Sequence, residues 1–300
     1  MRHGEPDGVG QGSVARAAPA GPRAGESWRL VLPLALFFSV FVVTPIALLG
    51  VVSVYQEPEL RTVGIAQYAK FFGDAFNVNI LGQTLALALK TTLLAVLIGY
   101  PLAYLYTRAP RRIQPVLLLV IVLPLLTSAV VRTFAWIVIL GRLGIVNSGL
   151  QALGFMDRPL TLLYTPTAVV VALAQIEMPL MVLPIITALL NLDPTLAQAS
   201  GVLGAGKWRT FWAVTLPLSV PGLLAGCLLV FAAAAGAFVT QTLIGGGRNM
   251  FMPMYIYQQG IQAYNYPFAA ALAMVLLGSV LVVVTAVNVL ARRSRGFVHG

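Results

Sequence analysis

The amino-acid sequence predicts an all-α polytopic membrane protein with six transmembrane helices. Of its 300 residues, 59% are hydrophobic and only 9% are charged, whereas about a quarter of the residues in a soluble domain carry a charge. Six apolar runs are each long enough to cross a bilayer, which takes about 20 residues. They cover residues 30–54, 83–107, 114–140, 164–190, 219–243 and 267–291. The composition therefore argues against a soluble globular fold.

Short polar segments flank this membrane domain, which we expect to span residues 28–291. Residues 1–27 are rich in Gly, Ala, Pro and Arg, a composition typical of a disordered tail. The first apolar run is far longer than the apolar core of a secretory signal, which has about 7–15 residues. We therefore expect the run to be retained as the first span, and residues 292–300 to form a second tail.

Arginine and lysine are unevenly distributed among the segments that connect the spans. Most lie in the two tails and in the second and fourth connections, while the other connections are poor in basic residues or mixed in charge. Because Lys and Arg accumulate on the cytoplasmic side of membrane proteins, both termini and the fourth connection are predicted to be cytoplasmic. The basic residues are Arg2, Arg16, Arg23, Arg29, Arg108, Arg111, Arg112, Lys207, Arg209, Arg292, Arg293 and Arg295.

The fourth connection, residues 191–218, begins with the signals of a short helix. Asp193 is a good N-cap, and Pro194 suits the first helical position because its missing N–H would have no partner there. Gly204 stands where a left-handed residue would end such a helix. A surface helix between two spans is well placed to contact a partner outside the bilayer.

A glycine-rich stretch leads into a second short helical piece, residues 207–212. Residues 201–207 match the G-x-x-x-x-G-K part of a phosphate-binding loop, but Trp208 stands where Ser or Thr is needed and no strand precedes the motif. The glycines are therefore interpreted as a cap and a turn, and no nucleotide site is expected. Further on, Pro217 and Pro221 are expected to break the chain before the fifth span.

This connection resembles the cytoplasmic "EAA" loop of ABC-importer permeases. The matching residues are Gln198, Ala199 and Ser200 at the Glu-Ala-Ala triplet, Gly204 at the motif's glycine, and Leu216-Pro217 at its closing Leu-Pro. Two triplet positions depart from the motif, and the amide at Gln198 keeps hydrogen bonding but not the usual charge. The resemblance implies a coupling helix that docks into a cleft on an ATPase subunit. It assigns this coupling to Gln198, Ala199, Ser200, Gly204, Ala205, Lys207 and Arg209.

Other segments resemble the spermidine/putrescine branch of these permeases. They are residues 131–140, 144–147, 181–184, 221–230 and 245–248. The resemblance implies the type I (MetI-like) importer fold in a bacterial inner membrane, with five core helices and a flanking first helix. It also implies a second homologous permease subunit, two ATP-binding subunits and an extracytoplasmic solute-binding protein as partners, and no nucleic acid. Similar permeases carry other small organic ions such as 2-aminoethylphosphonate, so both solute classes stay open.

Three ionisable residues, Lys90, Arg132 and Glu177, lie within the predicted spans. Such a group costs roughly 2.5–3.5 kcal/mol at bilayer depth and is expected to face protein or a water-filled path. Glu177 is the only acid in any span. It is predicted either to form a structural ion pair with Arg132 or to line the translocation path and attract a cationic solute. Lys90 and Arg132 can alternatively extend toward the outer interface.

Aromatic side chains offer a second kind of contact with a cationic solute. Tyr100, Tyr104 and Trp136 are therefore predicted to line the path with Glu177 and Arg132, through cation–π contacts. The alternative for each ring is a place in an interfacial aromatic belt or against lipid.

The sequence predicts no catalytic residue and no metal site. His3 and His299 lie at the termini, Cys227 is the one cysteine, and acids in the spans do not pair, whereas metal and catalytic sites need such groups together. A transport subunit without a cofactor of its own is expected, and the resemblance implies that ATP and Mg²⁺ bind to the ATPase partners. A self-contained secondary transporter is the alternative, but such proteins commonly carry inverted repeats, and none is evident here.

Overall fold

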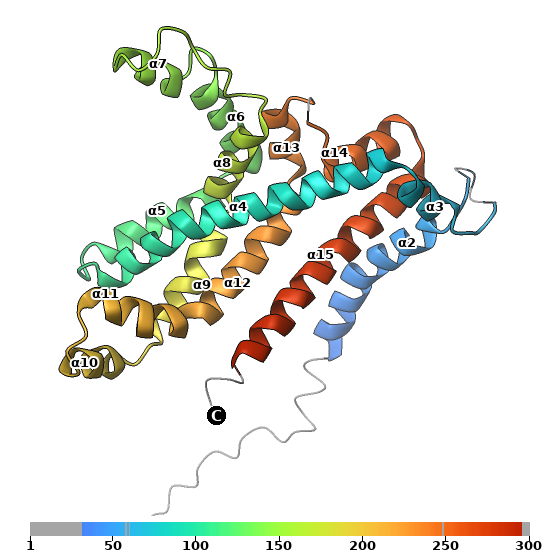
Figure 1. The fold of residues 1–300 in the computed structure, drawn as a ribbon. Helices are drawn as coiled ribbons and strands as arrows, with labels where there is room; N and C mark the ends of the chain where they lie inside the picture. The colour runs from blue at the N-terminus through green and yellow to red at the C-terminus, as the bar shows by residue number, and fades with distance from the viewer. Residues whose placement is uncertain (1–31, 58, 60, 248, 296–300) are drawn as a thin grey trace, which may run out of the picture. The chain divides into compact units, whose positions relative to one another are not determined.

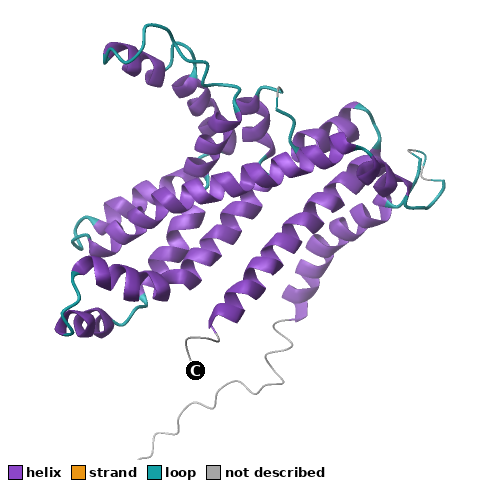
Figure 2. Cartoon of the chain, viewed as in Figure 1, coloured by secondary structure: helices purple, strands orange, loops and turns teal. Residues whose placement is uncertain are grey.

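The protein is all-helical in the computed structural model (Figures 1 and 2). The structure describes residues 32–295 apart from three single positions, and in this part of the chain the only β pairing is an isolated bridge between Tyr55 and Val63. The chain divides into two units, with the boundary between Leu48 and Leu49. The predicted N-terminal tail with its basic residues lies outside the described residues, which exclude 1–31, 58, 60, 248 and 296–300.

The helical elements follow one another along the chain; Figure 1 labels the α-helices, and the π-helical turns are denoted η. They are η1 (Ser39–Val43), α2 (Thr44–Ser53), α3 (Ala66–Gly73), α4 (Ala75–Arg108), α5 (Gln114–Leu126), α6 (Ala129–Leu140), α7 (Ile145–Ala152), α8 (Pro166–Ile176), α9 (Met178–Leu190), α10 (Pro194–Val202), α11 (Lys207–Thr210), η2 (Phe211–Thr215), α12 (Leu216–Ala235), α13 (Phe238–Gly245), α14 (Met252–Tyr257), η3 (Gln258–Gln262) and α15 (Tyr266–Arg295).

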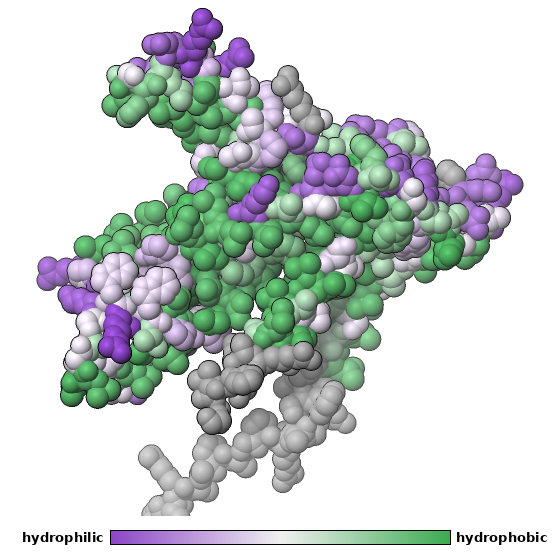
Figure 3. All heavy atoms as spheres, in the orientation of Figure 1, coloured by the Kyte–Doolittle hydropathy of each residue, from purple (hydrophilic) through white to green (hydrophobic). Residues whose placement is uncertain are grey.

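Five helical stretches among the described residues are long and apolar enough to cross a membrane, and a bent pair makes a sixth. Figure 3 shows that hydrophobic residues cover much of the surface over these helices, while hydrophilic residues gather around α7, near α11 and around α3. The stretches are Leu32–Ser53, Ala75–Arg108, Ala129–Ala152, Lys207–Ala235 and Tyr266–Ala291, and the bent pair is Pro166–Ile176 with Met178–Leu190. The predicted all-helical membrane fold is therefore confirmed.

Helices α4, α8, α9 and α12 pack together at the centre of the second unit. Two glycines allow α12 to approach α9 closely, as the small-residue spacing of the fifth span indicates. A Cβ atom on Gly222 would lie 2.4 Å from the carbonyl oxygen of Pro184, and one on Gly226 would lie 2.9 Å from that of Met181. The two backbones are therefore in direct contact.

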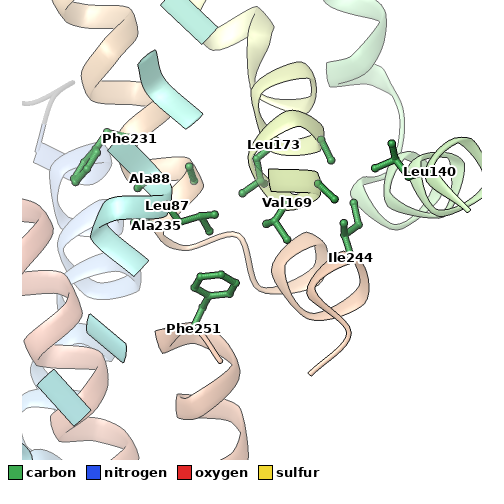
Figure 4. Packing of buried hydrophobic residues seen from close by; sticks show 12 residues of the cluster. Leu87, Ala88, Leu140, Val169, Leu173, Phe231, Ala235, Ile244 and Phe251 are labelled. Atoms are coloured by element: carbon green, nitrogen blue, oxygen red, sulfur yellow. The ribbon is translucent and has the colours of Figure 1, made fainter. Parts of the chain in front are cut away.

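Three clusters of buried hydrophobic residues hold the second unit together. Figure 4 shows the first, to which α4 contributes Leu87, α8 contributes Val169 and Leu173, α12 contributes Phe231 and α13 contributes Ile244. The second cluster joins α4, α5, α9 and α12, and the third joins α3, α4, α14 and α15. The first cluster also includes Leu140 of α6, and α6 packs directly on α8 and α13.

The third predicted span, residues 114–140, is not one helix. α5 ends at Leu126, and α6 begins at Ala129 after two residues with extended ψ angles. Both the N–H and the hydroxyl of Thr127 donate to the carbonyl of Pro124, which closes the end of α5. The prediction of a single helix was wrong here because the apolar pattern runs on across the break.

The fifth span also differs from its predicted range, residues 219–243. Pro217 and Pro221 do not break the chain, because α11, η2 and α12 form one helical stretch from Lys207 to Ala235. Each proline removes one backbone hydrogen bond, a loss that membrane helices tolerate when neighbouring helices hold them. At the other end of the chain, α15 continues to Arg295, so the first residues of the predicted C-terminal tail are helical.

Candidate coupling loop and translocation path

Helix α10 opens the fourth connection, and its start has the predicted capping. The Oδ1 atom of Asp193 accepts a hydrogen bond of 2.9 Å from the backbone N–H of Thr195. This bond holds the pKa of the Asp193 carboxyl below its usual range. Pro194 occupies the first turn, where a missing N–H leaves no helical bond unmade. The predicted helix start is confirmed.

Gly204 ends this helical region in the left-handed conformation, with φ at 80°. The N–H of Gly204 donates to the carbonyl of Gly201, and that of Ala205 donates to the carbonyl of Ser200, both at 3.0 Å. The hydroxyls of Ser200 and Thr210 share a hydrogen bond of 2.5 Å, which ties α10 to α11. The loop is thus formed by the short helix α10 and by α11, the first turn of the long helical stretch from Lys207 to Ala235.

The predicted coupling residues lie at the surface of this helix pair. No described side chain of α10 is buried, and Val202 and Leu203 are 88% and 85% exposed. Adjacent exposed apolar side chains on a loop outside the spans can serve as a contact surface for a partner. Of the predicted residues, Gln198, Ala199, Gly204, Lys207 and Arg209 are exposed, while Ser200 and Ala205 are half-buried.

The fourth span breaks at Glu177, where α8 and α9 meet at 45°. Pro179 is the cause, because it has no N–H to donate to the carbonyl four residues earlier. The N–H of Leu180 then donates to the carbonyl of Glu177 at 3.0 Å, rather than to that of Ile176. The carbonyl of Ile176 is left without its usual helical donor.

Arg132 of α6 donates from Nη1 to the Ile176 carbonyl at 3.0 Å. The Nε atom of Arg132 is buried and has no hydrogen-bond partner in the described part of the chain. Among the described residues, the only ion pair within 4.0 Å joins Arg61 to Glu59. The direct Arg132–Glu177 ion pair, one of the two predicted alternatives, is therefore not formed, and Arg132 supports the bent backbone instead.

Trp136, one turn after Arg132 on α6, also contacts this bend. Its indole Nε1 donates to Oε1 of Gln175 at 3.0 Å. The structure thus brings Arg132, Trp136 and Glu177 together, and Glu177 is only half-buried. Sequence reasoning missed Gln175, although a polar side chain two residues before the sole acid of the spans was a usable signal.

Tyr100 and Tyr104 lie in a different place, beside the fourth connection. Both rings pack edge-on against Phe211 of η2, with ring centroids 5.8 and 5.3 Å away. Tyr100 is buried, and its hydroxyl shares a hydrogen bond of 2.8 Å with that of Ser219. Tyr100 and Tyr104 both border a cavity of about 330 Å³ that also reaches Lys207. The predicted path residues therefore fall into two separate groups.

The group at the bend offers binding chemistry. A lone carboxylate accepts hydrogen bonds from an ammonium group, and an indole face attracts a cation. Among the described residues, no cluster of three His, Cys, Asp or Glu side chains is arranged to hold a metal ion. The bend thus presents one carboxylate, at Glu177, with the Trp136 indole bonded to Gln175 two residues before it.

Comparison with known proteins decides the family. Residues 92–296 match the model of a family described as "Binding-protein-dependent transport system inner membrane component". The chain belongs to this family. The permease is a multi-pass inner-membrane subunit of an ABC importer and has no catalytic role, as predicted. Permease subunits of this family work without a bound cofactor, and the ATPase partners bind ATP.

Three known proteins are similar to the permease in sequence or in fold. It is 35% identical over 209 residues to the spermidine/putrescine transport system permease protein PotB of Salmonella typhimurium (strain SL1344), covering 70% of this chain and 72% of that protein. A bacterial ABC transporter that imports the acidic polysaccharide alginate matches with a TM-score of 0.71 at 19% identity, covering 90% and 96% of the two chains. The MetNI methionine ABC transporter, in inward-facing form, matches with a TM-score of 0.56 at 20% identity, covering 72% and 94%. These structures confirm the predicted importer fold.

Proposed function

We propose that this permease moves a small organic amine into the cytoplasm, in a complex with two ATP-binding subunits, a second homologous permease subunit and an extracytoplasmic solute-binding protein. ATP binding in the partner subunits moves the coupling loop, and rigid-body movement of the helices opens the path to each side in turn. Membership of a binding-protein-dependent transport family supports the partners, and the exposed helix α10 supports the ATPase contact.

The coupling loop and both termini face the cytoplasm in this proposal. One cavity of about 410 Å³ is lined by Arg108, from the second connection, and by Asp193, from the fourth. The two connections that are rich in basic residues are therefore neighbours at one end of the helices. Because basic connections favour the cytoplasmic side, this end is the one that meets the ATPase subunits.

Helix α10 and its two flanking turns form the proposed ATPase contact. Val202 and Leu203 supply apolar area at its tip, and Gln198 supplies a neutral hydrogen-bonding group in place of a charged one. Lys207 and Arg209 are exposed on the neighbouring α11 and add positive charge to the surface. The coupling roles proposed for Gln198, Ala199, Ser200, Gly204, Ala205, Lys207 and Arg209 rest on this arrangement.

Polyamines such as spermidine and putrescine are the first candidate solutes. The observation that carries this choice is the half-buried Glu177 at the bend of the fourth span, with the Trp136 indole held nearby through Gln175. A carboxylate beside an aromatic ring suits a protonated amine. The identity with PotB supports the same solute class.

A second candidate is a small organic ion that carries an anionic group as well as an amine, such as 2-aminoethylphosphonate. One observation favours it: the Lys90 side chain is exposed and lines a cavity, where its ammonium group would repel a polyamine and attract an anion. The importer mechanism is the same for both candidates.

The test is uptake of labelled putrescine into liposomes that contain this permease with its ATPase, second permease and binding protein. Uptake that needs both ATP and the binding protein is expected. Uptake of 2-aminoethylphosphonate in place of putrescine would support the importer function and contradict the assignment of a polyamine as its solute. Gradient-driven uptake by the permease alone, without ATP, would overturn the proposal.

A further inference from the structure

The third, fourth and fifth spans each break part-way along, and the breaks separate two groups of helices. The halves farther from the coupling loop, α6, α8 and α13, pack on one another, and we call them the outer halves. Of the halves nearer to the loop, α9 packs on both α5 and α12. Helix α4 runs unbroken beside α8, α9 and α12. A movement of the outer halves against the rest therefore bends the chain at three breaks.

The break in the fifth span leaves a backbone carbonyl without its usual helical donor, as in the fourth span. The N–H of Phe238, which would donate to the carbonyl of Ala234 in a continuous helix, bonds to that of Gly236 at 2.8 Å. One other backbone N–H reaches the Ala234 carbonyl, at 3.4 Å. The side-chain amide of Gln241 supplies the short bond, since its Nε2 donates to this carbonyl at 2.7 Å. Gln241 of α13 thus holds the end of α12 across the break.

Gln241 and Arg132 do the same work at two breaks, and each keeps one polar atom unpaired. The Oε1 atom of Gln241 and the Nε atom of Arg132 are buried and have no hydrogen-bond partner within the described residues. Gln241 itself is 1% exposed. The first atom only accepts a hydrogen bond, and the second only donates one. Since buried polar atoms normally have partners, this complementary pair calls for an explanation.

The two side chains project to the same side of the contact between α6 and α13. The hydroxyls of Thr133 and Thr240 share a hydrogen bond of 3.0 Å at this contact. Arg132 comes one residue before Thr133, and Gln241 comes one residue after Thr240. The third and fifth spans run in the same direction, and each residue turns a helix by about 100°, so these two positions lie on one side. That side faces α8, because Arg132 bonds to Ile176 there and α13 also packs on α8.

We propose that Gln241 is a positioning residue of the import cycle, and that its Oε1 accepts a hydrogen bond from the Nε–H of Arg132 when the outer halves move. The bond joins the breaks of the fourth and fifth spans, so that α6, α8 and α13 move as one body. Two unpaired buried atoms disfavour the conformation described here, and the bonded conformation relieves that cost. The inference rests on the alternating-access import proposed above and adds a residue to it.

The experiment is a double-mutant cycle on ATP-driven uptake of labelled putrescine by the complete complex in liposomes. Gln241→Met and Arg132→Met are each expected to lower kcat about tenfold, the effect of one hydrogen bond to a charged group, with the KM unchanged by Gln241→Met. The double variant is expected to lose no more than either single variant, because both changes remove the same bond. A loss of about a hundredfold in the double variant would overturn the inference, as would a normal kcat in Gln241→Met.

Thr91→Val is the matched control. Its hydroxyl is also buried and unpaired, but it lies on the unbroken α4, so kcat is expected to stay normal. A tenfold loss there would show that any change to a buried polar group slows transport, and would contradict the role given to Gln241.

A second variant covers the case in which Gln241→Met does not fold. Gln241→Glu keeps an acceptor for Arg132 but cannot donate to Ala234 when it is ionised, so its kcat is expected to stay close to that of the wild type. A tenfold loss in this variant would contradict the inference. Absence of putrescine uptake by the wild type would count against the proposed solute instead. The same cycle is then measured on ATP hydrolysis by the complex, where non-additive losses support the pair and additive losses overturn it.

Discussion

Arg132 of α6 donates a hydrogen bond of 3.0 Å to the backbone carbonyl of Ile176, the residue before the bend in the fourth span. The helical donor that this carbonyl would otherwise have, the N–H of Leu180, bonds to Glu177. A side chain from one predicted span therefore completes the backbone hydrogen bonding of another. The bend depends on this contact as well as on Pro179.

Arg132→Met removes the donor and is expected to destabilise the permease. A buried carbonyl left without a partner costs about 1–3 kcal/mol. Thermal unfolding in detergent measures the change, with Arg142→Met as the control, because Arg142 is exposed in the loop after α6. Equal stability of the two variants would contradict the role given to Arg132.

Glu177→Gln tests the path role of the carboxylate, because it removes the charge and keeps the shape. With no ion pair to lose, the variant is expected to unfold at nearly the wild-type temperature. The KM for the transported amine is expected to rise about tenfold, the effect of one hydrogen bond to a charged group. A large loss of stability with an unchanged KM would indicate a structural role.

Gly204→Ala is expected to uncouple ATP hydrolysis from uptake. The φ angle of 80° is left-handed and no atom lies within 4 Å of an added Cβ, so the change acts through backbone strain of about 1–2 kcal/mol. The loop would rearrange to relieve this strain while the spans remain folded. Uptake per ATP hydrolysed is the measurement.

Gly201→Ala is the matched control for Gly204→Ala. It lies in α10, has open space around an added Cβ, and alanine favours the helix by roughly 1 kcal/mol. Normal coupling is expected in this variant. Loss of coupling in Gly201→Ala with normal coupling in Gly204→Ala would reject the strain argument.

Gly222→Ala is expected to destabilise the contact between α12 and α9. The added Cβ would lie 2.4 Å from the carbonyl oxygen of Pro184, and overpacking of this kind costs about 1–3 kcal/mol. Gly278→Ala in α15, with nothing within 4 Å of its Cβ, is the control. A fall in the midpoint of thermal unfolding is expected for the first variant only.

Tyr100→Phe tests whether Tyr100 has a packing role or lines the translocation path. The variant loses the hydrogen bond to Ser219 but leaves that hydroxyl its bond to the Leu216 carbonyl, so the expected cost is about 1 kcal/mol. The KM for the amine is expected to stay unchanged, because the lost hydroxyl is bonded to Ser219 and the ring is kept. Tyr104→Phe removes a hydroxyl with no hydrogen bond in the described part of the chain, and it should leave stability unchanged.

Local signals made helix α10 predictable. An N-cap at Asp193, a proline at the first position and a left-handed glycine at Gly204 each act within a few residues, and the structure has all three. Membrane-spanning length was equally accessible, because hydropathy is a property of a continuous stretch. The family followed from the same loop.

The sequence analysis missed one local break and two features that depend on tertiary contacts. The break after α5 interrupts an apolar run with no charge or glycine to mark it. Pro217 looked like a stop, yet the close contact of α12 with α9 holds the helix together through it. The pairing of Arg132 with a backbone carbonyl joins residues 44 positions apart, and no sequence spacing predicts such a partner.

The continuous helical stretch from Lys207 to Ala235 makes α12 a lever arm. Its 29 residues extend over about 43 Å, from the surface proposed to meet the ATPase to the far end of the span. Gly222 and Gly226 let it approach α9 closely part-way along its length. This contact with the bent span is the point around which the stretch would tilt. A tilt of about 5° around this contact therefore displaces either end of the stretch by roughly 1–2 Å.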